Sequence, residues 1–417
     1  MVHNDMSAQP KIHIPHPTAR PGEEPDFSYL ALSGAGEIER PPTDSSVEDI
    51  EHLSFKLVRV LDEDFELKGP WVPDISKEQL LESLKMMTLV RAYDDRMYRM
   101  QRQGKISFYM QSLGEEACSI GPGMVLRDSD MCFPHYRQQA LYLMRGTGLL
   151  NMMCHCLSNT RDFCRGRQMP VFYQHAKGNV FTISGNLTTQ YPQAVGWAMA
   201  SAIKGSEDIA ASWIGDGSTA ESDFHQALTF AAVYQAPVIL NVVNNQWAIS
   251  TFQAFAGGEL RPFAARGPGY GIPGLRVDGN DLFATYAATE WAAERARNGG
   301  GPTLIEFVTY RGGAHSTSDD PSRYRPKDEW AAFPLGDPLA RLRGHLEKLG
   351  YWSEDQQADL EAEMKQHVTD TWKEACSYGT MTDGPWLDPR EMFEDVYEEM
   401  PEHLKEQQQE MLSLEED

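Results

Sequence analysis

Apolar residues recur at helical spacing in a long segment of the first quarter of the chain. Between Ser76 and Gln103 they lie at i, i+3, i+4 and i+7, which predicts one long amphipathic helix. The stretch that follows, SFYMQSLGEEACSIGPGMVL, predicts a loop and then a second helix. Residues 1–75 are instead rich in proline and acidic residues, so we expect an extended arm with at most short strands, such as one at 55–60.

In the middle of the chain, short apolar runs alternate with helical patterns. The runs predict strands at 209–214, 237–243, 275–279 and 304–310, with helices at 221–234 and 282–297. Strand–helix–strand repeats of this length predict an α/β fold whose mostly parallel sheet is flanked by helices. We therefore divide the chain into an N-terminal arm (1–75), an α/β domain (76–335) and a helical, acidic C-terminal region (336–417).

The charge balance excludes several classes of partner. There are 37 Lys and Arg residues against 61 Asp and Glu residues, a formal net charge of −24, so non-specific binding to nucleic acid or to an anionic membrane is disfavoured. No apolar run approaches the roughly 20 residues of a membrane-spanning helix. The first twenty residues have neither an apolar signal core nor a transit-peptide composition, so we expect a soluble cytoplasmic protein.

Six cysteines in 417 residues are too few for a disulfide scaffold. Cys154, His155, Cys156 and Cys164 suggest zinc at first sight, but their spacing fits no common structural zinc pattern. The surrounding GLLNMMCHCLSN is apolar at helical intervals, which favours buried core thiols.

Candidate chemistry lies where two predicted strands end. Gly215-Asp216-Gly217 closes one strand, and after 26 further residues Asn244-Asn245 closes the next. Parallel strands present their carboxyl ends at one edge of the sheet, where ligands bind. A carboxylate and an amide oxygen there suit magnesium, and Gly217 and Ser218, at the start of the following helix, suit a diphosphate. The alternative is two ordinary turns, since Gly, Asp and Asn favour turns anyway.

This spacing matches the thiamin-diphosphate motif, and the chain resembles the alpha subunits of the decarboxylating component of 2-oxo acid dehydrogenase complexes. Within that group it is most similar to the bacterial branched-chain members. The resemblance runs from about residue 107 to 400 and includes SFYMQSLGEEA, MCFPHYRQQA, GRQMP, FTISGNLTTQ, WIGDGSTAESDFHQAL, VVNNQWAIST, ARGPGYGI, LRVDGND, HSTSDDPSRYR and FEDVYEEMP.

The resemblance implies a set of site residues. Asp216, Asn245 and the backbone carbonyl of Trp247 match magnesium ligands, and the matched cofactor-binding positions are Tyr136, Arg137, Gly185, Leu187, Gly217, Ser218 and His315. Four further positions match a potassium site found in some relatives, although a simple turn explains this stretch equally well: Ser184, Asn186, Thr189 and Gln190. Val243 departs from animal relatives, which carry a phosphate-contacting Arg there.

His315 matches an active-site histidine that assists acyl transfer to the lipoyl group. Its segment, RGGAHSTSDDPSRYR, is rich in Gly, Ser and Asp, so we expect a mobile loop. An imidazole with a near-neutral pKa suits proton donation to a departing sulfur. A solvent-exposed histidine without a role is the alternative.

Two absences in the sequence complete this interpretation. No G-x-G-x-x-G follows a strand, so the sequence predicts no nicotinamide site, which is consistent with the lipoamide acceptor that the resemblance implies. The chain also lacks a second α/β half that would carry the activating Glu, which in two-subunit relatives belongs to the beta subunit. The resemblance therefore implies an α2β2 heterotetramer with interface contacts from the arm and the C-terminal helices, and acyl transfer to the lipoyl domain of dihydrolipoyl acyltransferase.

Three functions remain to be separated. The first is oxidative decarboxylation of 3-methyl-2-oxobutanoate and its homologues. The second is a pyruvate or acetoin dehydrogenase alpha subunit, although HSTSDDP in place of the HSMSDP of pyruvate members favours the branched-chain activity. The third is a catalytically silent structural subunit, which the intact Asp216, Asn245 and His315 argue against.

Overall fold

The fold is built on a six-stranded parallel sheet. The computed structural model describes residues 12–414. The strands are β1 (Leu57–Val58), β2 (Met131–Phe133), β3 (Ala210–Gly215), β4 (Val238–Asn244), β7 (Gly274–Asp278) and β8 (Thr303–Val308), in the order β1-β7-β8-β4-β3-β2. A small antiparallel hairpin pairs β5 (Trp247–Ala248) with β6 (Thr251–Phe252). The α/β architecture predicted from the sequence is confirmed. The edge strand β2 was not predicted, because it is too short to show a periodic pattern of apolar residues.

Helices cover both faces of the sheet. They are α1 (Val47–Ile50), α2 (Lys77–Arg102), α3 (Ala117–Val125), α4 (Gln139–Met144), α5 (Leu149–Leu157), α6 (Gln190–Ile203), α7 (Ser222–Tyr234), α8 (Arg266–Gly269), α9 (Leu282–Arg297), α10 (Pro338–Lys348), α11 (Glu354–Cys376) and α12 (Glu402–Leu414). Short 3₁₀ turns join them: η1 (Glu51–Ser54), η2 (Ala176–Gly178), η3 (Gly217–Ala220), η4 (Gln253–Ala256), η5 (Phe263–Ala265), η6 (Pro321–Arg323) and η7 (Pro389–Phe393).

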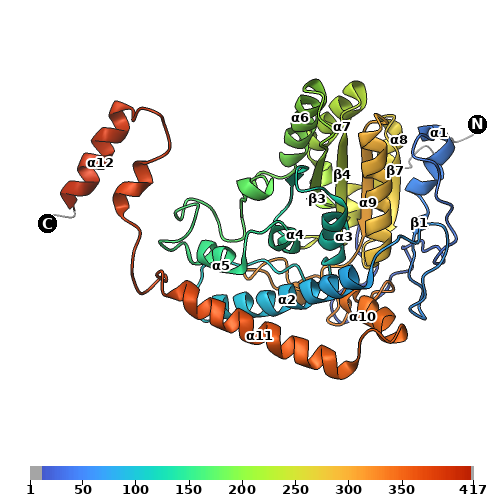
Figure 1. The fold of residues 1–417 in the computed structure, drawn as a ribbon, viewed down its shortest axis with the longest axis horizontal. Helices are drawn as coiled ribbons and strands as arrows, with labels where there is room; N and C mark the ends of the chain where they lie inside the picture. Colours follow the sequence, from blue (N-terminus) through green and yellow to red (C-terminus); the bar gives the residue numbers. More distant parts are fainter. Residues whose placement is uncertain (1–11, 415–417) are drawn as a thin grey trace, which may run out of the picture.

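Alternate residues of β4 explain why this strand is apolar throughout. Ile239 and Val243 join the core shared with α2, α3 and α9, whereas Leu240 and Val242 join the core shared with α6 and α7. Every residue of β4 is buried, as expected for a central parallel strand. Figure 1 shows α6 and α7 on the opposite side of β3 and β4 from α2.

The long helix predicted from the apolar spacing is α2, and its ends agree with the prediction. Ser76 is its N-cap, and the Ser76 and Gln79 side chains each accept a hydrogen bond from the other's backbone N–H, which forms a capping box. Gly104 follows the C-terminal end with φ of +69°, a conformation that glycine adopts without strain.

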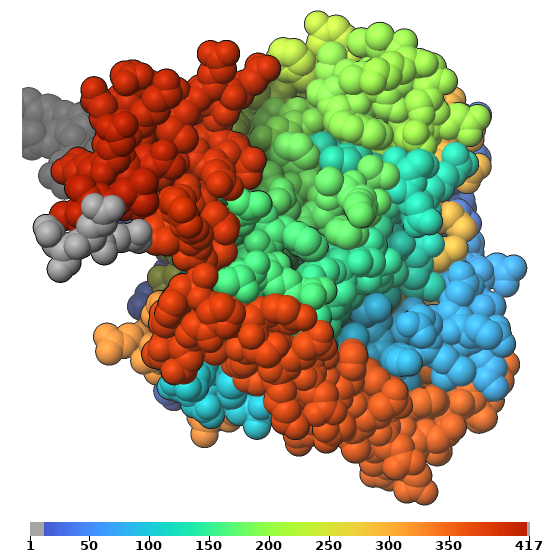
Figure 2. Space-filling view, turned by 60° about the vertical axis from the view of Figure 1, so that its left-hand side comes forward, coloured from blue at the N-terminus to red at the C-terminus, as the bar shows by residue number. Residues whose placement is uncertain are grey.

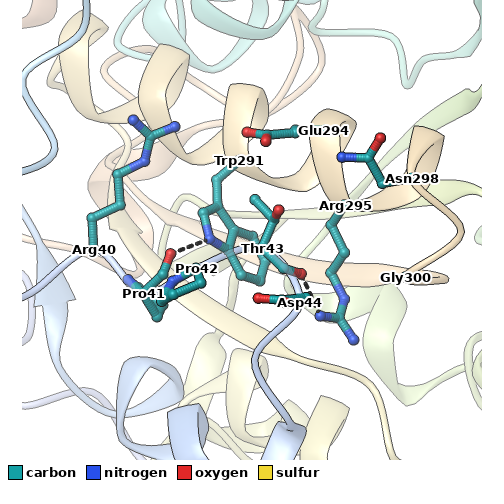
Figure 3. A pocket seen from close by; sticks show the side chains of 10 residues that line it. All are labelled: Arg40, Pro41, Pro42, Thr43, Asp44, Trp291, Glu294, Arg295, Asn298 and Gly300. Atoms are coloured by element: carbon teal, nitrogen blue, oxygen red, sulfur yellow. Dashed lines mark hydrogen bonds between the residues drawn. The ribbon is translucent and has the colours of Figure 1, made fainter.

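The N-terminal arm is part of the sheet layer. Its strand β1 pairs in parallel with β7, with Leu57 opposite Arg276. At residues 41–43, before β1 in the sequence, the arm lies on α9. There Trp291 donates to the Pro41 carbonyl (2.9 Å) and Arg295 donates to the Thr43 carbonyl (2.7 Å) (Figure 3). The domain boundary at residue 75 stays a prediction, and residues 1–11 of the arm lie outside the described range.

The C-terminal region is helical, as the sequence predicts. Helix α11 packs along α2, and α12 stands away from the body of the molecule (Figure 1). Beside α12, the red C-terminal segment lies against the green loop that follows α5 (Figure 2), where Arg165 pairs with Glu394 at 2.9 Å. Apolar side chains remain exposed on this segment, among them Trp386, Met392 and Tyr397.

The cysteine prediction is confirmed for the core. All six thiols are free, and Cys118, Cys132, Cys154 and Cys156 are buried, whereas Cys164 and Cys376 are half-buried. Across residues 12–414, no helix combines the length and the apolar character needed to cross a membrane.

Candidate cofactor and metal site

The two predicted metal-ligand segments lie side by side at the carboxyl edge of the sheet. β3 and β4 pair in register, with Gly215 opposite Val243. Asp216 follows the end of β3 and therefore lies next to the residues that follow the end of β4, among them Asn245. The strand order places both at the edge where α/β sheets bind ligands.

Gly217 is required by the contact between these two turns. A Cβ at Gly217 would lie 2.4 Å from the Cβ of Ala248, so a larger residue would force the turns apart. The sequence predicted that this glycine allows a diphosphate to approach the backbone, and it gave no indication of the contact with Ala248. Ser218 also differs from expectation, because it lies in η3 and α7 begins only at Ser222. Its carbonyl accepts from the Thr188 hydroxyl (2.7 Å).

Asp216 is a buried carboxylate without a full set of partners. It is 2% exposed, and its Oδ2 atom has no hydrogen-bond partner among the described residues. Burial raises its pKa to about 7, against the lowering effect of the Gly217 N–H and the Arg311 charge. A buried, unpaired carboxylate is costly unless a cation neutralises it. Its chemistry therefore fits a hard divalent cation.

Asn245 is oriented by Glu115. Its Nδ2 donates to Glu115 Oε1 (2.6 Å), and within residues 12–414 its Oδ1 accepts only the Trp247 N–H (3.2 Å). Glu115 is fully buried, and burial raises its pKa although the nearby Arg137 charge lowers it. This hydrogen bond assigns the amide nitrogen to Glu115 and leaves the amide oxygen for a metal.

Arg311 holds the third predicted metal ligand. Its guanidinium donates to the Trp247 carbonyl (2.8 Å), the Ile249 carbonyl (2.9 Å) and the Tyr324 hydroxyl (2.7 Å). A carbonyl oxygen has two lone pairs, so the Trp247 carbonyl retains one for a cation.

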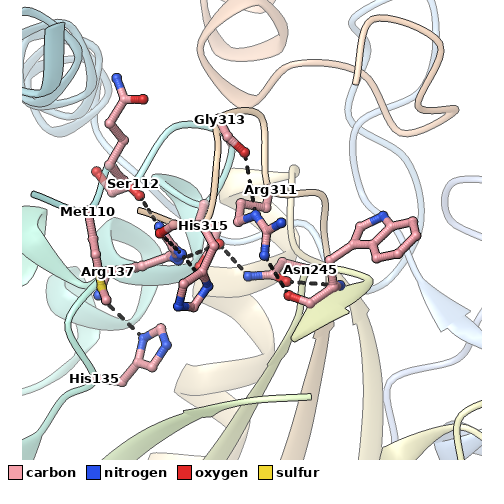
Figure 4. Close-up of polar contacts among 12 residues, drawn as sticks. Met110, Ser112, His135, Arg137, Asn245, Arg311, Gly313 and His315 are labelled. Carbon is pink, nitrogen blue, oxygen red and sulfur yellow. Dashed lines mark hydrogen bonds and ion pairs between the residues drawn. The ribbon is translucent and has the colours of Figure 1, made fainter. Parts of the chain in front are cut away.

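Arg137 and His315 contact each other directly. The Arg137 guanidinium is 1% exposed and donates to the Gln111 carbonyl (2.5 Å) and the His315 carbonyl (2.6 Å). Its Nη2 also lies 3.2 Å from His315 Nδ1. Figure 4 shows the side chains of Arg137, His315, Arg311 and Asn245 converging from three separate segments.

His315 is held in its neutral form by its surroundings. Burial, followed by the charges of Arg137 and Arg311, lowers its pKa to about 2, which differs from the near-neutral value expected from the sequence. Because Nδ1 faces a guanidinium donor, the ring proton belongs on Nε2. The loop is also tied down more than expected, since the His315 N–H donates to Asp319 Oδ2 (2.8 Å) and the Thr317 N–H to the Tyr109 carbonyl (2.9 Å).

Tyr136 connects this cluster to the Gly185 loop. Its ring lies 6.0 Å from the His315 ring in a T-shaped contact and stacks against Phe172 at 6.4 Å. A Cβ at Gly185 would lie 3.3 Å from the Phe172 ring, so Gly185 adjoins the site through Phe172. Leu187 is half-exposed on the same loop.

The four positions matched to a potassium site form a locally bonded turn. Ser184 Oγ accepts from the Asn186 N–H (3.1 Å), and the Thr189 hydroxyl donates to the Asn186 carbonyl (3.0 Å). Gln190 donates to the Trp213 carbonyl (2.8 Å), and its buried Oε1 atom has no partner among the described residues.

Two site residues were missed by the sequence analysis: Glu115 and Arg311. Glu115 stands in the GEEA motif and Arg311 just before GGAHSTSDD, both among the segments singled out, but nothing in their spacing points to Asn245 or Trp247. Val243 is fully buried in the core and carries no charge, whereas Arg137 and Arg311 bring positive charge close to Asp216 and His315.

Comparison with known proteins agrees with this geometry. Residues 84–383 match the family model described as "Dehydrogenase E1 component", and residues 8–48 match "2-oxoisovalerate dehydrogenase E1 alpha subunit N terminal". The chain is 58% identical over 401 residues to the 2-oxoisovalerate dehydrogenase subunit alpha of Pseudomonas aeruginosa, covering 96% of this chain and 98% of that protein. It is 40% identical over 357 residues to the mitochondrial subunits of Bos taurus and Homo sapiens, covering 85% of this chain and 76% and 78% of theirs. The chain therefore belongs to the dehydrogenase E1 component family, in its 2-oxoisovalerate dehydrogenase alpha-subunit branch.

Proposed function

We propose that this chain is the alpha subunit of the decarboxylating component of a branched-chain 2-oxo acid dehydrogenase complex. With a beta subunit it carries out the oxidative decarboxylation of 3-methyl-2-oxobutanoate and its homologues, with acyl transfer to the lipoyl domain of dihydrolipoyl acyltransferase. The observation that carries this proposal is the buried Asp216 carboxylate, unpaired at Oδ2, beside Asn245 at the carboxyl edge of the sheet.

The oxygen atoms at this edge suit magnesium, and its guanidinium groups suit the diphosphate of thiamin diphosphate. Asp216 Oδ2, Asn245 Oδ1 and the Trp247 carbonyl are the three oxygens for magnesium, which usually completes its coordination with phosphate and water. Arg137 and Arg311 are the cations for the diphosphate and offset the absence of a positive charge at Val243. When bound, the cofactor supplies the electron sink into which carbon dioxide departs.

The remaining predicted contacts surround the same edge. We assign direct cofactor contacts to Tyr136, Gly217 and Ser218, and contacts from the adjoining loop to Gly185 and Leu187. We include a potassium ion at Ser184, Asn186, Thr189 and Gln190 in the proposal, supported by the unpartnered Gln190 Oε1. A bound cation there would order the loop that Thr188 links to the Asp216 turn.

The position and the tautomer of His315 suit proton donation to the acyl acceptor. Its Nε2–H is free to donate, while Nδ1 is held by Arg137. A diphosphate dianion beside the ring would oppose the effect of Arg137 and Arg311 and raise its pKa, so that the imidazole can take up and return a proton. We therefore assign to His315 the proton that a lipoyl sulfur needs as its disulfide opens.

A beta subunit completes the site. The carboxylate that activates the cofactor's aminopyrimidine ring is assigned to that subunit, in an α2β2 assembly. The exposed apolar side chains of the C-terminal segment, such as Trp386 and Met392, support a role in subunit contacts. The cytoplasmic location stays a prediction of the sequence.

Rates measured with the reconstituted alpha and beta subunits test the proposal. We expect faster reduction of an artificial acceptor with 3-methyl-2-oxobutanoate than with pyruvate or acetoin, and no turnover by the alpha chain alone. A preference for pyruvate or acetoin would favour that rival subunit. Failure to bind thiamin diphosphate in the presence of magnesium would leave a silent structural subunit.

A further inference from the structure

A second cluster of ligand-type side chains lies apart from the edge described above, where α5 ends and the 158–175 loop begins. His155, Asp162 and Cys164 each offer one ligand atom, and these atoms lie within 4.8 Å of one another. His155 and Asp162 are each 4% exposed, and Cys164 is half-buried. We propose that these three side chains form a zinc-binding site. The set differs from the cysteine pattern considered in the sequence, since Cys154 and Cys156 belong to the core.

The hydrogen bonds around the cluster are those of a metal site's outer shell. His155 Nε2 donates to the Met169 carbonyl (2.9 Å), and Nδ1 faces Asp162 Oδ1, 3.0 Å away, where a bound cation would replace the proton shared by these two atoms. Histidine ligands typically donate their other ring nitrogen to a carbonyl in this manner, which fixes the tautomer. Asp162 Oδ2 accepts from the Gly166 N–H (2.8 Å), so the carboxylate is also oriented.

A small cavity beside the cluster offers a fourth coordination position. It has a volume of about 10 Å³, enough for about one water molecule, and its lining includes the three ligands, Thr147 and Asn151. Thr147 is 3% exposed, and its hydroxyl has no hydrogen-bond partner among the described residues; the same holds for Asn151 Oδ1. A water molecule bound to zinc would satisfy these two atoms and complete a tetrahedral set.

The charges balance with a divalent cation. Zinc bound by a neutral imidazole, a carboxylate and a thiolate would place a charge of +2 against two negative charges, one on Asp162 and one on Cys164, so that no net charge remains in a buried place.

The site would fix a loop that borders the proposed cofactor site. The 158–175 loop carries Phe172, whose ring stacks on Tyr136, and Arg165, which pairs with Glu394 of the C-terminal segment. Zinc would tie this loop to the end of α5 without contacting the magnesium edge. We therefore expect a structural metal, and its binding is measurable without reference to activity.

Cobalt substitution of the full-length chain, reconstituted with its beta subunit, tests the proposal. The protein is stripped of metal, titrated with Co²⁺ in the presence of excess Mg²⁺, and compared with Cys164→Ser and with Cys376→Ser, which changes a half-buried thiol elsewhere. We expect one Co²⁺ per alpha chain, with a near-ultraviolet thiolate-to-cobalt band in the wild type and in Cys376→Ser. Cys164→Ser should lose this band and bind Zn²⁺ at least about tenfold more weakly in a chelator competition.

Two outcomes would overturn the zinc site. One is the absence of a thiolate band in the wild type at saturating Co²⁺, which would leave the cluster as a hydrogen-bonded contact between His155 and Asp162. The other is an unchanged band in Cys164→Ser. Asp162→Asn provides a second variant in case the serine substitution unfolds the loop, and it should weaken Zn²⁺ binding while keeping the thiolate band. Neither measurement depends on decarboxylation, so the zinc site and the proposed activity are tested separately.

Discussion

The side-chain amide of Asn245 donates to Glu115 Oε1 at 2.6 Å, across 130 residues of sequence. This contact decides which end of the amide faces the Asp216 side of the sheet edge. Glu115 is in turn 3.6 Å from the Arg137 guanidinium, so one buried carboxylate orients the predicted metal ligand and the predicted phosphate ligand together.

Replacement of Glu115 should therefore impair metal-dependent cofactor binding. We expect Glu115→Ala to weaken it by about 10–100-fold, as is typical when an outer-shell partner of a metal ligand is lost. Glu115→Gln keeps an oxygen acceptor for Asn245 and should lose much less. Calorimetric titration of the chain, reconstituted with its beta subunit, with thiamin diphosphate at fixed magnesium measures this, and equal affinities for all three proteins would refute it.

Asp216 should control both metal binding and the pH dependence of stability. Asp216→Ala is expected to abolish magnesium-dependent cofactor binding with little loss of fold, because it removes a ligand from a turn rather than volume from the core. Unchanged cofactor affinity in this variant would contradict the metal assignment.

The raised pKa of Asp216 predicts the direction of the pH effect. The folded, cofactor-free chain keeps the carboxyl protonated up to about pH 7, above its ordinary pKa of 3.8. The folded state therefore binds more protons between these values, so the free energy of unfolding falls as pH rises from about 4 to about 7, by at most about 4 kcal/mol. Urea unfolding of wild type and Asp216→Asn should show a shallower decline in the variant. A parallel decline in both would contradict the prediction.

His315 and Arg137 should separate two steps of the reaction. We expect His315→Ala to retain part of the decarboxylation measured with an artificial acceptor, but to lose about 10²–10⁴-fold in transfer to a lipoyl domain. Arg137→Ala should lower both rates together, since it removes a proposed cofactor ligand and also the hydrogen bond to the His315 carbonyl. Both rates are compared at saturating thiamin diphosphate, and equal losses in the two assays for His315→Ala would leave it a loop-ordering residue.

The N-terminal arm should contribute to cofactor binding through Tyr29. Its hydroxyl donates to Gln246 Oε1 (3.2 Å), and Gln246 lies between Asn245 and Trp247 with φ of +75°. Tyr29→Phe keeps the ring packing and should weaken cofactor binding by about 2–10-fold, the effect of one hydrogen bond. Ser28→Ala, a change of the exposed neighbouring residue, is the matched control. Calorimetry that finds Tyr29→Phe equal to this control would show that the arm supports the loop by packing alone.

Much of the fold follows from local sequence. The capping box at Ser76 and the apolar spacing after it place α2, and the apolar run at 237–243 places a strand buried on both faces. These features depend on interactions within one segment, where periodicity and capping reflect the final structure directly. The pairing of Asp216 with Asn245 at one edge also follows from the sequence, because parallel strands connected by a helix bring their carboxyl ends together.

Tertiary structure alone decided the details of the site. The bonds from Glu115 to Asn245 and from Arg311 to Trp247, the contact of Tyr29 with Gln246, and the meeting of Gly217 with Ala248 all join segments that have no common periodicity. The neutral state of His315 depends on burial and on two arginines brought from elsewhere in the chain. Distances and burial of this kind arise only when the segments pack against one another. The sequence alone therefore identified the candidate ligands, whereas tertiary packing determined their orientation and their charge.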